Sequence, residues 1–316
     1  MFAALTVFLE VLLVGISIAF VILSFHWYFM VVYKLDNAGW ARAPHAQQKN
    51  GTGSWADRSP LHDAACYGRV LALKTLLDQG ACANLSTIDS VTPLHEACLG
   101  GHAVCAKMLI SAGAQVNARN IDGSTPLCDA CSRGSVSCIN LLLSHGAEVN
   151  PSLITASPLH EAVLRGHQEC VDILIENGAR IEHTDCHHGT PLHVACVRGH
   201  VDCAKSLLLA GANPNATKNH ETPLHYAAQN NYTAVIQVLV EHGANITALN
   251  QNGKRALHLT AEDSEARQLL FYVEGHVESL KQLCRLTIRQ SVGAGRLEYL
   301  SSLKLPDLML NFLCHR

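Results

Sequence analysis

The chain has 316 residues, of which 48% are hydrophobic and 16% charged, and its formal net charge is -3 at pH 7. Because the sequence has no basic run, its charge argues against a nucleic-acid-binding surface. Its 13 cysteines would suit a disulfide framework or a zinc site, but they are spaced with an internal repeat described below.

The first predicted element is an apolar segment at the N-terminus. Residues 1–33 contain a single charged side chain, that of Glu10, and residues 11–32 are uncharged. This length spans a bilayer as a transmembrane helix. Lys34 and Arg42 follow the segment, whereas no lysine or arginine precedes it. The positive-inside tendency then places the rest of the chain on the cytoplasmic side, anchored in the endoplasmic reticulum membrane.

Alternatives to a spanning helix stay open for this segment. A cleaved signal peptide is disfavoured because a basic n-region is missing and the apolar run is long for an h-region. A hairpin that dips into one leaflet also fits the sequence. So does a helix that docks on the first repeat, in which case the chain would be soluble in the cytoplasm.

Residues 34–55 are predicted to be a linker. They contain Gly39, Pro44, a polar run at residues 47–50 and a glycine-rich run at residues 51–54, and they lack an apolar periodicity. This linker separates the N-terminal segment, residues 1–33, from the repeats.

A motif of Thr or Ser, then Pro, Leu and His, which we call the TPLH motif, recurs along the chain. Its intervals are 33, 33, 32, 33, 32 and 33 residues. The hydroxyl residue suits a helix N-cap, proline the first helical turn and leucine the core, and the histidine is expected to bond within the turn. The seven motifs begin at Ser59, Thr92, Thr125, Ser157, Thr190, Thr222 and Arg255.

A period near 33 with this motif resembles ankyrin repeats. The resemblance predicts an all-α solenoid with β-turn fingers over residues 56–270, with six regular repeats and a degenerate seventh as a cap. In the second repeat we expect a first helix over residues 92–99, a break at residues 100–101 and a second helix over residues 102–112. A finger follows and turns at Asp122 and Gly123.

Most cysteines occupy two positions of the repeat, counting Thr or Ser of the motif as position 1. Position 7 holds Cys98, Cys131 and Cys196, and position 14 holds Cys105, Cys138, Cys170 and Cys203. This periodicity predicts small buried apolar residues in a reduced chain. Cys128 and Cys131 form a C-x-x-C pair, but no second pair stands at zinc-finger spacing, so we expect no metal and no cofactor.

No motif of a catalytic site is present. The sequence lacks a nucleophile elbow, a phosphate-binding loop and an H-E-x-x-H zinc motif, and its acidic residues are scattered. We therefore expect a non-catalytic protein. Position 9 carries Arg133, Arg165 and Arg198, a column that is either a solvated edge or a contact for acidic partners.

The C-terminal tail has a different pattern, in which Leu280, Leu283, Cys284 and Ile288 share one face at helical spacing. Two further short helices are expected before the end of the chain. The first pattern resembles the Elongin-C-binding part of a SOCS box over residues 277–316. The run Leu305, Pro306, Asp307 and Leu308 resembles its cullin-selecting part, in which the family usually has proline where Leu308 stands.

Over residues 54–316 the chain is thus similar to ankyrin repeat and SOCS box proteins. The resemblance implies a substrate receptor of a ubiquitin ligase, with Elongin B, Elongin C and a cullin with its RING protein as partners. Its target would bind the ankyrin repeats. The alternative is a non-ligase ankyrin adaptor or membrane scaffold whose tail only caps the stack.

The least repetitive residues of the fingers are the predicted target surface, although turn formation explains some of them. They are Ile88, Asp89, Asn120, Ile121, Asp122, His187, His188, Asn219 and His220.

Overall fold

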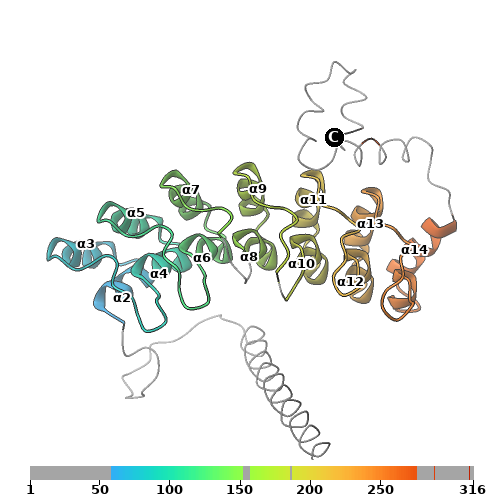
Figure 1. Ribbon diagram of the computed structural model, residues 1–316, viewed down its shortest axis with the longest axis horizontal. Helices are drawn as coiled ribbons and strands as arrows, with labels where there is room; N and C mark the ends of the chain where they lie inside the picture. Colours follow the sequence, from blue (N-terminus) through green and yellow to red (C-terminus); the bar gives the residue numbers. More distant parts are fainter. Residues whose placement is uncertain (1–57, 152–156, 186, 276–287, 289–312, 314–316) are drawn as a thin grey trace, which may run out of the picture. The chain divides into compact units, whose positions relative to one another are not determined.

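The computed structural model describes residues 58–151, 157–185, 187–275, 288 and 313. The chain divides into two compact units, Met1–Gly53 and Ser54–Arg316, and every described residue belongs to the second. Successive repeats contribute pairs of antiparallel helices, and Figure 1 shows these helices in two rows. The predicted helical solenoid is therefore confirmed.

Each repeat places its first helix in an inner row and its second helix in an outer row. The inner helices are α2 (Pro60–Cys66), α4 (Pro93–Gly100), α6 (Pro126–Arg133), α8 (Pro158–Arg165), α10 (Pro191–Arg198) and α12 (Pro223–Gln229). The outer helices are α3 (Val70–Asp78), α5 (Ala103–Ser111), α7 (Val136–Ser144), α9 (Gln168–Glu176), α11 (Val201–Leu209) and α13 (Thr233–Glu241). Neighbours within each row pack against one another.

The TPLH motif starts each inner helix as its residue types predict. Thr92 is extended, with φ −99° and ψ 163°, and Pro93 occupies the first helical turn of α4. The helix ends at Gly101, which adopts a left-handed φ of 76°. Of the two residues at which the break was expected, Gly100 is still helical and the left-handed turn falls on Gly101.

The histidine of the motif joins one repeat to the next. The backbone N–H of Thr92 donates to Nδ1 of His95 over 3.1 Å, and the Thr92 hydroxyl lies 2.9 Å from the same nitrogen. Nδ1 is therefore unprotonated, and Nε2 carries the proton and donates to the carbonyl oxygen of Ser124 over 3.2 Å. Burial lowers the pKa of His95 to about 4, in keeping with a neutral ring.

Three other motif histidines make the same bond to the following finger. The Nε2 atom of His62 lies 3.1 Å from the carbonyl oxygen of Val91. That of His160 lies 2.9 Å from Gly189 O, and that of His225 lies 3.3 Å from Lys254 O. The predicted role of these histidines inside the turn is thus confirmed, and the structure adds the bond across the boundary between repeats.

A second histidine, at position 11 of three repeats, joins each of those repeats to the preceding one. His167 bonds the carbonyl oxygen of Ser132 over 3.2 Å, and its ring lies against Gly134. A Cβ atom on Gly134, where φ is 77°, would lie 2.6 Å from His167 Nδ1. Only glycine fits this left-handed corner, which is why the glycine and the histidine occur together. His102 and His200 make equivalent bonds.

Small side chains let the inner helices approach closely. Ala97, Ala130 and Ala195 at position 6 are completely buried, as are the cysteines at position 7. Every cysteine at positions 7 and 14 is buried, so the prediction of small buried residues is confirmed. None of the described cysteines forms a disulfide.

The fingers are tied together by a row of asparagines. The side-chain amide of Asn84 donates to Gly113 O over 2.8 Å, and its oxygen accepts from the backbone N–H of Gln115 over 2.7 Å. Asn117 and Asn150 repeat this pair of bonds in the next two repeats, and Asn215 does so in the fifth. In the fourth repeat Glu182 takes this place, and its carboxylate accepts from the backbone N–H of Asn213 over 2.7 Å. Within the described ranges the fingers contain isolated β-bridges but no strands.

The seventh repeat departs from the regular plan. Its motif forms a short 3-10 helix, η1 (Ala256–Leu259), and α14 (Glu265–Gly275) packs against both η1 and α13. Ala266 and Leu270 are buried at this contact, whereas Phe271 and Tyr272 are 71% and 60% exposed. The degenerate repeat covers the last apolar face and itself presents aromatic side chains.

No helix in the ranges that the structure describes is long and apolar enough to cross a bilayer. The predicted transmembrane segment, residues 11–32, and the linker at residues 34–55 lie outside those ranges.

Replacing a motif leucine should unfold the stack far more readily than replacing an exposed finger residue. Leu94 and Leu192 are 0% and 1% exposed. Leu94→Ala and Leu192→Ala should each lower the free energy of unfolding by about 2–5 kcal/mol, because each leaves a cavity between helices. His187→Ala, at an exposed position, is the matched control and should change little. Urea unfolding measures the free energy of unfolding of each variant. A larger decrease for His187→Ala than for the two leucine variants would contradict this packing.

Candidate interaction surface

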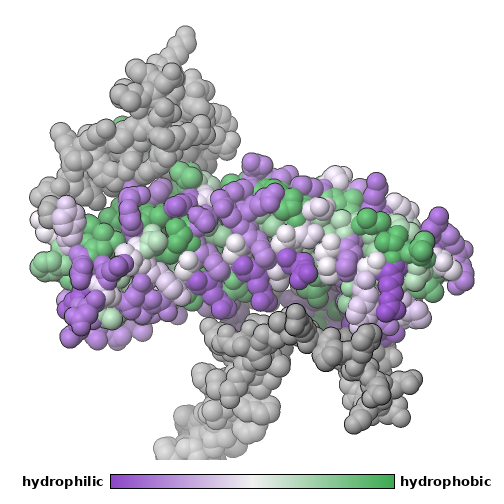
Figure 2. Space-filling view, turned by 180° about the vertical axis from the view of Figure 1, so that it is seen from behind, coloured by the Kyte–Doolittle hydropathy of each residue, from purple (hydrophilic) through white to green (hydrophobic). Residues whose placement is uncertain are grey.

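The predicted target residues lie in the turns of the fingers and differ in exposure. Ile88 and Ile121 are 78% and 64% exposed. Asp122, His187, Asn219 and His220 are also exposed, and Asp89, Asn120 and His188 are half-buried. Exposed apolar side chains also occur elsewhere on the stack, and Figure 2 shows hydrophobic and hydrophilic residues interspersed over one face. The target surface stays a prediction.

The finger turn at residues 120–124 is held by its own hydrogen bonds. The Asn120 side-chain oxygen accepts from Ser124 N over 2.8 Å, and Asn120 N donates to Ser124 O over 3.0 Å. The N–H of Ile121 donates to Asp89 O of the preceding finger over 3.0 Å. The backbone beneath Ile121 is thus fixed, and its side chain is left to solvent.

The finger turn at residues 185–189 shows why turn formation explains some of the predicted residues. The buried Asp185 carboxylate accepts from the backbone N–H groups of His188 and Gly189 and from the ring Nδ1 of His188 at 2.9 Å. Burial alone would raise the pKa of Asp185, but these bonds from His188 lower it below its ordinary value. His188 is therefore engaged within the turn, whereas His187 is exposed.

Two of the remaining residues occupy strained positions. Asn219 and His220 have φ values of 50° and 62°, in the left-handed region. Asparagine and histidine tolerate this region better than most residues. Their presence is thus explained in part by the turn itself.

A row of carboxylates runs along the inner helices and was not predicted from the sequence. Position 5 of four successive repeats carries an acidic residue, and this regular spacing could have revealed the row. The four residues are Asp63, Glu96, Asp129 and Glu161.

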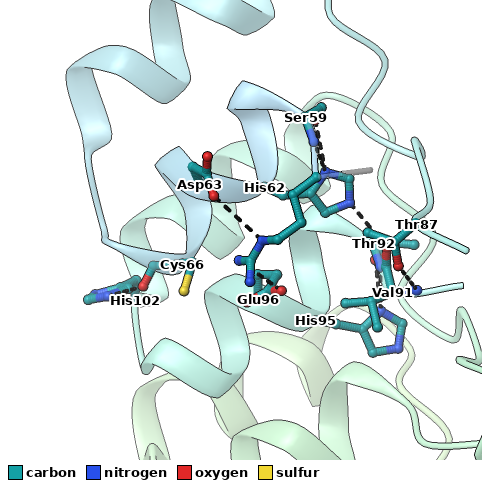
Figure 3. Close-up of polar contacts among 11 residues, drawn as sticks. Ser59, His62, Asp63, Cys66, Thr87, Val91, Thr92, His95, Glu96 and His102 are labelled. Atoms are coloured by element: carbon teal, nitrogen blue, oxygen red, sulfur yellow. Dashed lines mark hydrogen bonds and ion pairs between the residues drawn. The ribbon is translucent and has the colours of Figure 1, made fainter. Parts of the chain in front are cut away.

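Arg58 pairs with the first two carboxylates of the row, Asp63 and Glu96 (Figure 3). The Arg58 guanidinium lies 2.9 Å from Glu96 and 3.5 Å from Asp63, and so joins α2 to α4. The side chains of Arg58 and Glu96 are only 12% and 11% exposed. A pair this far from water is screened less than a surface pair, so it fixes the first repeat against the second.

Asp129 is the next carboxylate of the row, and among the described residues no ion pair joins a lysine or arginine to it. Burial, followed by repulsion from Glu161 and Glu96, raises the pKa of Asp129 to about 7. The Asp129 carboxylate accepts a hydrogen bond of 3.5 Å from the hydroxyl of Ser124. Arg133 follows one helical turn later on α6, but no ion pair joins it to Asp129 in the part of the chain that the structure describes.

Among the described residues no group of three or more His, Cys, Asp or Glu side chains is placed to hold a metal ion. Burial raises the pKa of Cys128 to about 11, and the pKa of Cys131 is raised as well, so both thiols stay protonated at neutral pH. The C-x-x-C pair is therefore part of the core, with Cys128 in the place of the motif histidine.

Of the predicted Elongin-contacting residues, only Ile288 is described; it is helical and 39% exposed. Near the end of the chain Leu313 is also helical and is 3% exposed. Leu280, Leu283, Cys284 and the run from Leu305 to Leu308 lie outside the described residues.

Comparison with protein families places both halves of this architecture. Ankyrin repeats match residues 61–153, 152–218 and 208–285, and the SOCS box matches residues 276–314. The chain belongs to the ankyrin repeat and SOCS box family. The resemblance inferred from the TPLH motif and the tail is confirmed.

Individual relatives in this family are similar over most of their length. Ankyrin repeat and SOCS box protein 5 of Bos taurus is 52% identical over 315 residues, covering 100% of this chain and 94% of that protein. Ankyrin repeat and SOCS box protein 13 of Mus musculus is 61% identical over 263 residues, covering 83% and 95%. The crystal structure of the human ASB11 ankyrin repeat domain is 49% identical and matches with a TM-score of 0.67, covering 70% of this chain and 100% of that one.

The raised pKa of Asp129 predicts how Asp129→Asn changes stability with pH. A free aspartate has a pKa of about 3.9, so between about pH 4 and 7 the folded chain binds more protons at this site than the unfolded chain does. The contribution of Asp129 to stability therefore falls as the pH rises through this range. Asp129→Asn should raise the free energy of unfolding by about 1–3 kcal/mol at pH 8, and by much less near pH 4.

Urea unfolding of both proteins at several pH values measures this difference. Glu169→Gln, at an exposed position of α9, removes one negative charge outside the row and is the matched control. A gain for Asp129→Asn that does not vary with pH would contradict the assignment.

Proposed function

We propose that this chain is the substrate-recognition subunit of an Elongin–cullin–RING ubiquitin ligase. The observation that carries the proposal is the SOCS box at residues 276–314, directly after the ankyrin stack. The ankyrin repeats bind a target protein, and the SOCS box binds Elongin B and Elongin C and, with them, a cullin and its RING protein. The result is ubiquitination and degradation of the target.

The mechanism in this proposal is proximity. Two binding surfaces on one chain raise the effective concentration of target lysines near the charged conjugating enzyme. The stack suits this task because histidines such as His95 and His167 bond neighbouring repeats to one another. The chain contributes no catalytic residue, since ubiquitin transfer is carried out by the enzymes that it brings together.

Elongin C is contacted by the first helix of the SOCS box. Leu280, Cys284 and Ile288 lie one helical turn apart in sequence and so share one face. Ile288 is 39% exposed, which leaves it accessible to a partner. Leu280 is the anchor that enters an apolar pocket, with Leu283 and Cys284 packed beside it.

The cullin is selected by Leu305, Pro306, Asp307 and Leu308. Leu308 replaces the usual proline of this motif and changes the contact. The target is bound by the finger residues Ile88, Asp89, Asn120, Ile121, Asp122, His187, His188, Asn219 and His220.

Leu280→Ala combined with Cys284→Phe should abolish co-purification of Elongins B and C. The double change removes the anchor, worth about 2 kcal/mol or more, and overfills its neighbour. Leu305→Ala combined with Pro306→Ala is the matched comparison, and should retain the Elongins and lose the cullin. Affinity capture of the full chain from cells measures both. Undiminished Elongin C with the first variant would favour the non-ligase adaptor, whose tail only caps the stack.

Anchoring in the endoplasmic reticulum membrane through residues 11–32 stays a prediction from their uncharged, apolar sequence. The full chain should stay in the membrane pellet after an alkaline wash, because a spanning helix resists extraction. A chain that lacks residues 1–50 is the control and should stay folded and appear in the supernatant. Release of the full chain by the wash would support the soluble cytoplasmic alternative.

A further inference from the structure

Two neighbouring fingertips present isoleucines to solvent on a fixed backbone. Ile88 and Ile121 are 78% and 64% exposed, and the Ile121 N–H bonds Asp89 O over 3.0 Å. A side chain on a hydrogen-bonded turn loses little further freedom on binding, so a pair of this kind favours a partner with apolar side chains.

Negative charge lies close to these isoleucines. Asp89 and Asp122 each directly neighbour one of them in the sequence, and Ser124, at the end of the turn that carries Ile121, bonds Asp129 over 3.5 Å. Glu96 and Glu161 repel the charge on Asp129 from either side along the row. An apolar tip is thus combined with carboxylates on the fingers and with Asp129 on the inner helix α6.

Arg58 provides an example, within this protein, of a cation bound by two carboxylates of the row. Its guanidinium enters between Asp63 and Glu96, 3.5 and 2.9 Å away, and is only 12% exposed. Arg58 stands one residue before its TPLH motif. Val91 and Ser124 hold the same place in the next two repeats and carry no charge. The residue before the TPLH motif is therefore a cation in the first repeat and an uncharged residue in the second and third.

We propose that Ile88, Asp89, Ile121, Asp122 and Asp129, together the fingertip surface, bind a target segment that carries lysine or arginine beside an apolar residue. The inference rests on the proposed function, since this segment is the part of the target that the receptor recognises. The cation of the segment pairs with Asp129 as Arg58 pairs with Glu96, and its apolar neighbour covers the two isoleucines. Charge complementarity selects a basic segment over an acidic one.

Selection from a library of short random peptides displayed on phage tests the proposal with the full chain as bait. Peptides retained by the wild-type chain should be enriched in lysine or arginine next to leucine, isoleucine or phenylalanine. Fluorescence anisotropy of a retained peptide should then show roughly tenfold weaker binding to Asp129→Asn. Ile88→Ser combined with Ile121→Ser should weaken binding to a similar extent, and high salt should weaken binding to the wild-type chain.

Two variants serve as matched controls. Glu169→Gln removes a negative charge from α9, and Leu249→Ser removes an apolar side chain that is 60% exposed on another finger. Both should bind the peptide as the wild-type chain does. Retained peptides without basic residues, no retained peptides, or equal loss in the controls would each overturn the proposal.

Elongin C capture on the same proteins separates this inference from the proposed function. Asp129→Asn and the isoleucine double variant should retain Elongin C, because neither change touches the SOCS box. If the wild-type chain binds basic peptides and does not capture Elongin C, the ligase function fails and the fingertip surface stands. If it captures Elongin C and shows no preference for basic peptides, the fingertip surface fails alone.

Discussion

A neutral histidine bonded across the boundary between neighbouring repeats is the interaction on which this stack depends. The Nδ1 atom of His95 accepts from the motif threonine, and Nε2 donates to Ser124 O, 29 residues further on. Protonation of Nδ1 would remove the acceptor, so the ring must be buried and neutral. Because the second bond exists only when the next finger is in place, each repeat is completed by its neighbour, as in other solenoids.

The bonds between neighbouring repeats also fix the positions of the exposed finger residues. Asparagines tie four of the fingers to the next one, and Ile121 N bonds the preceding finger directly. Exposed residues therefore have defined positions, although they lie in loops. Burial of Asp129 beside Glu96 and Glu161 raises its pKa and costs free energy when the carboxylate is charged.

Much of the fold could be predicted, because each residue of the TPLH motif has one local task that period and residue type reveal. The finger residues Ile88 and Ile121 could be identified because they depart from the repeat. Arg58 and the carboxylate row were missed for a physical reason. In sequence, an acidic residue that recurs with the repeat is indistinguishable from a solvated charge. The ion pair of Arg58 with Glu96 joins two different repeats, so the spacing within one repeat does not show it.

The sequence by itself determined the helical repeat, the buried positions of leucine and cysteine, and the SOCS box, because these follow from local spacing and side-chain size. The tertiary structure alone decided which histidine nitrogen carries the proton, which carboxylates pair with Arg58, and which finger residues point to solvent. These properties depend on distances between groups about 30 residues apart, as between His95 and Ser124. Stacking one repeat on the next sets those distances, and no periodicity within a repeat contains them.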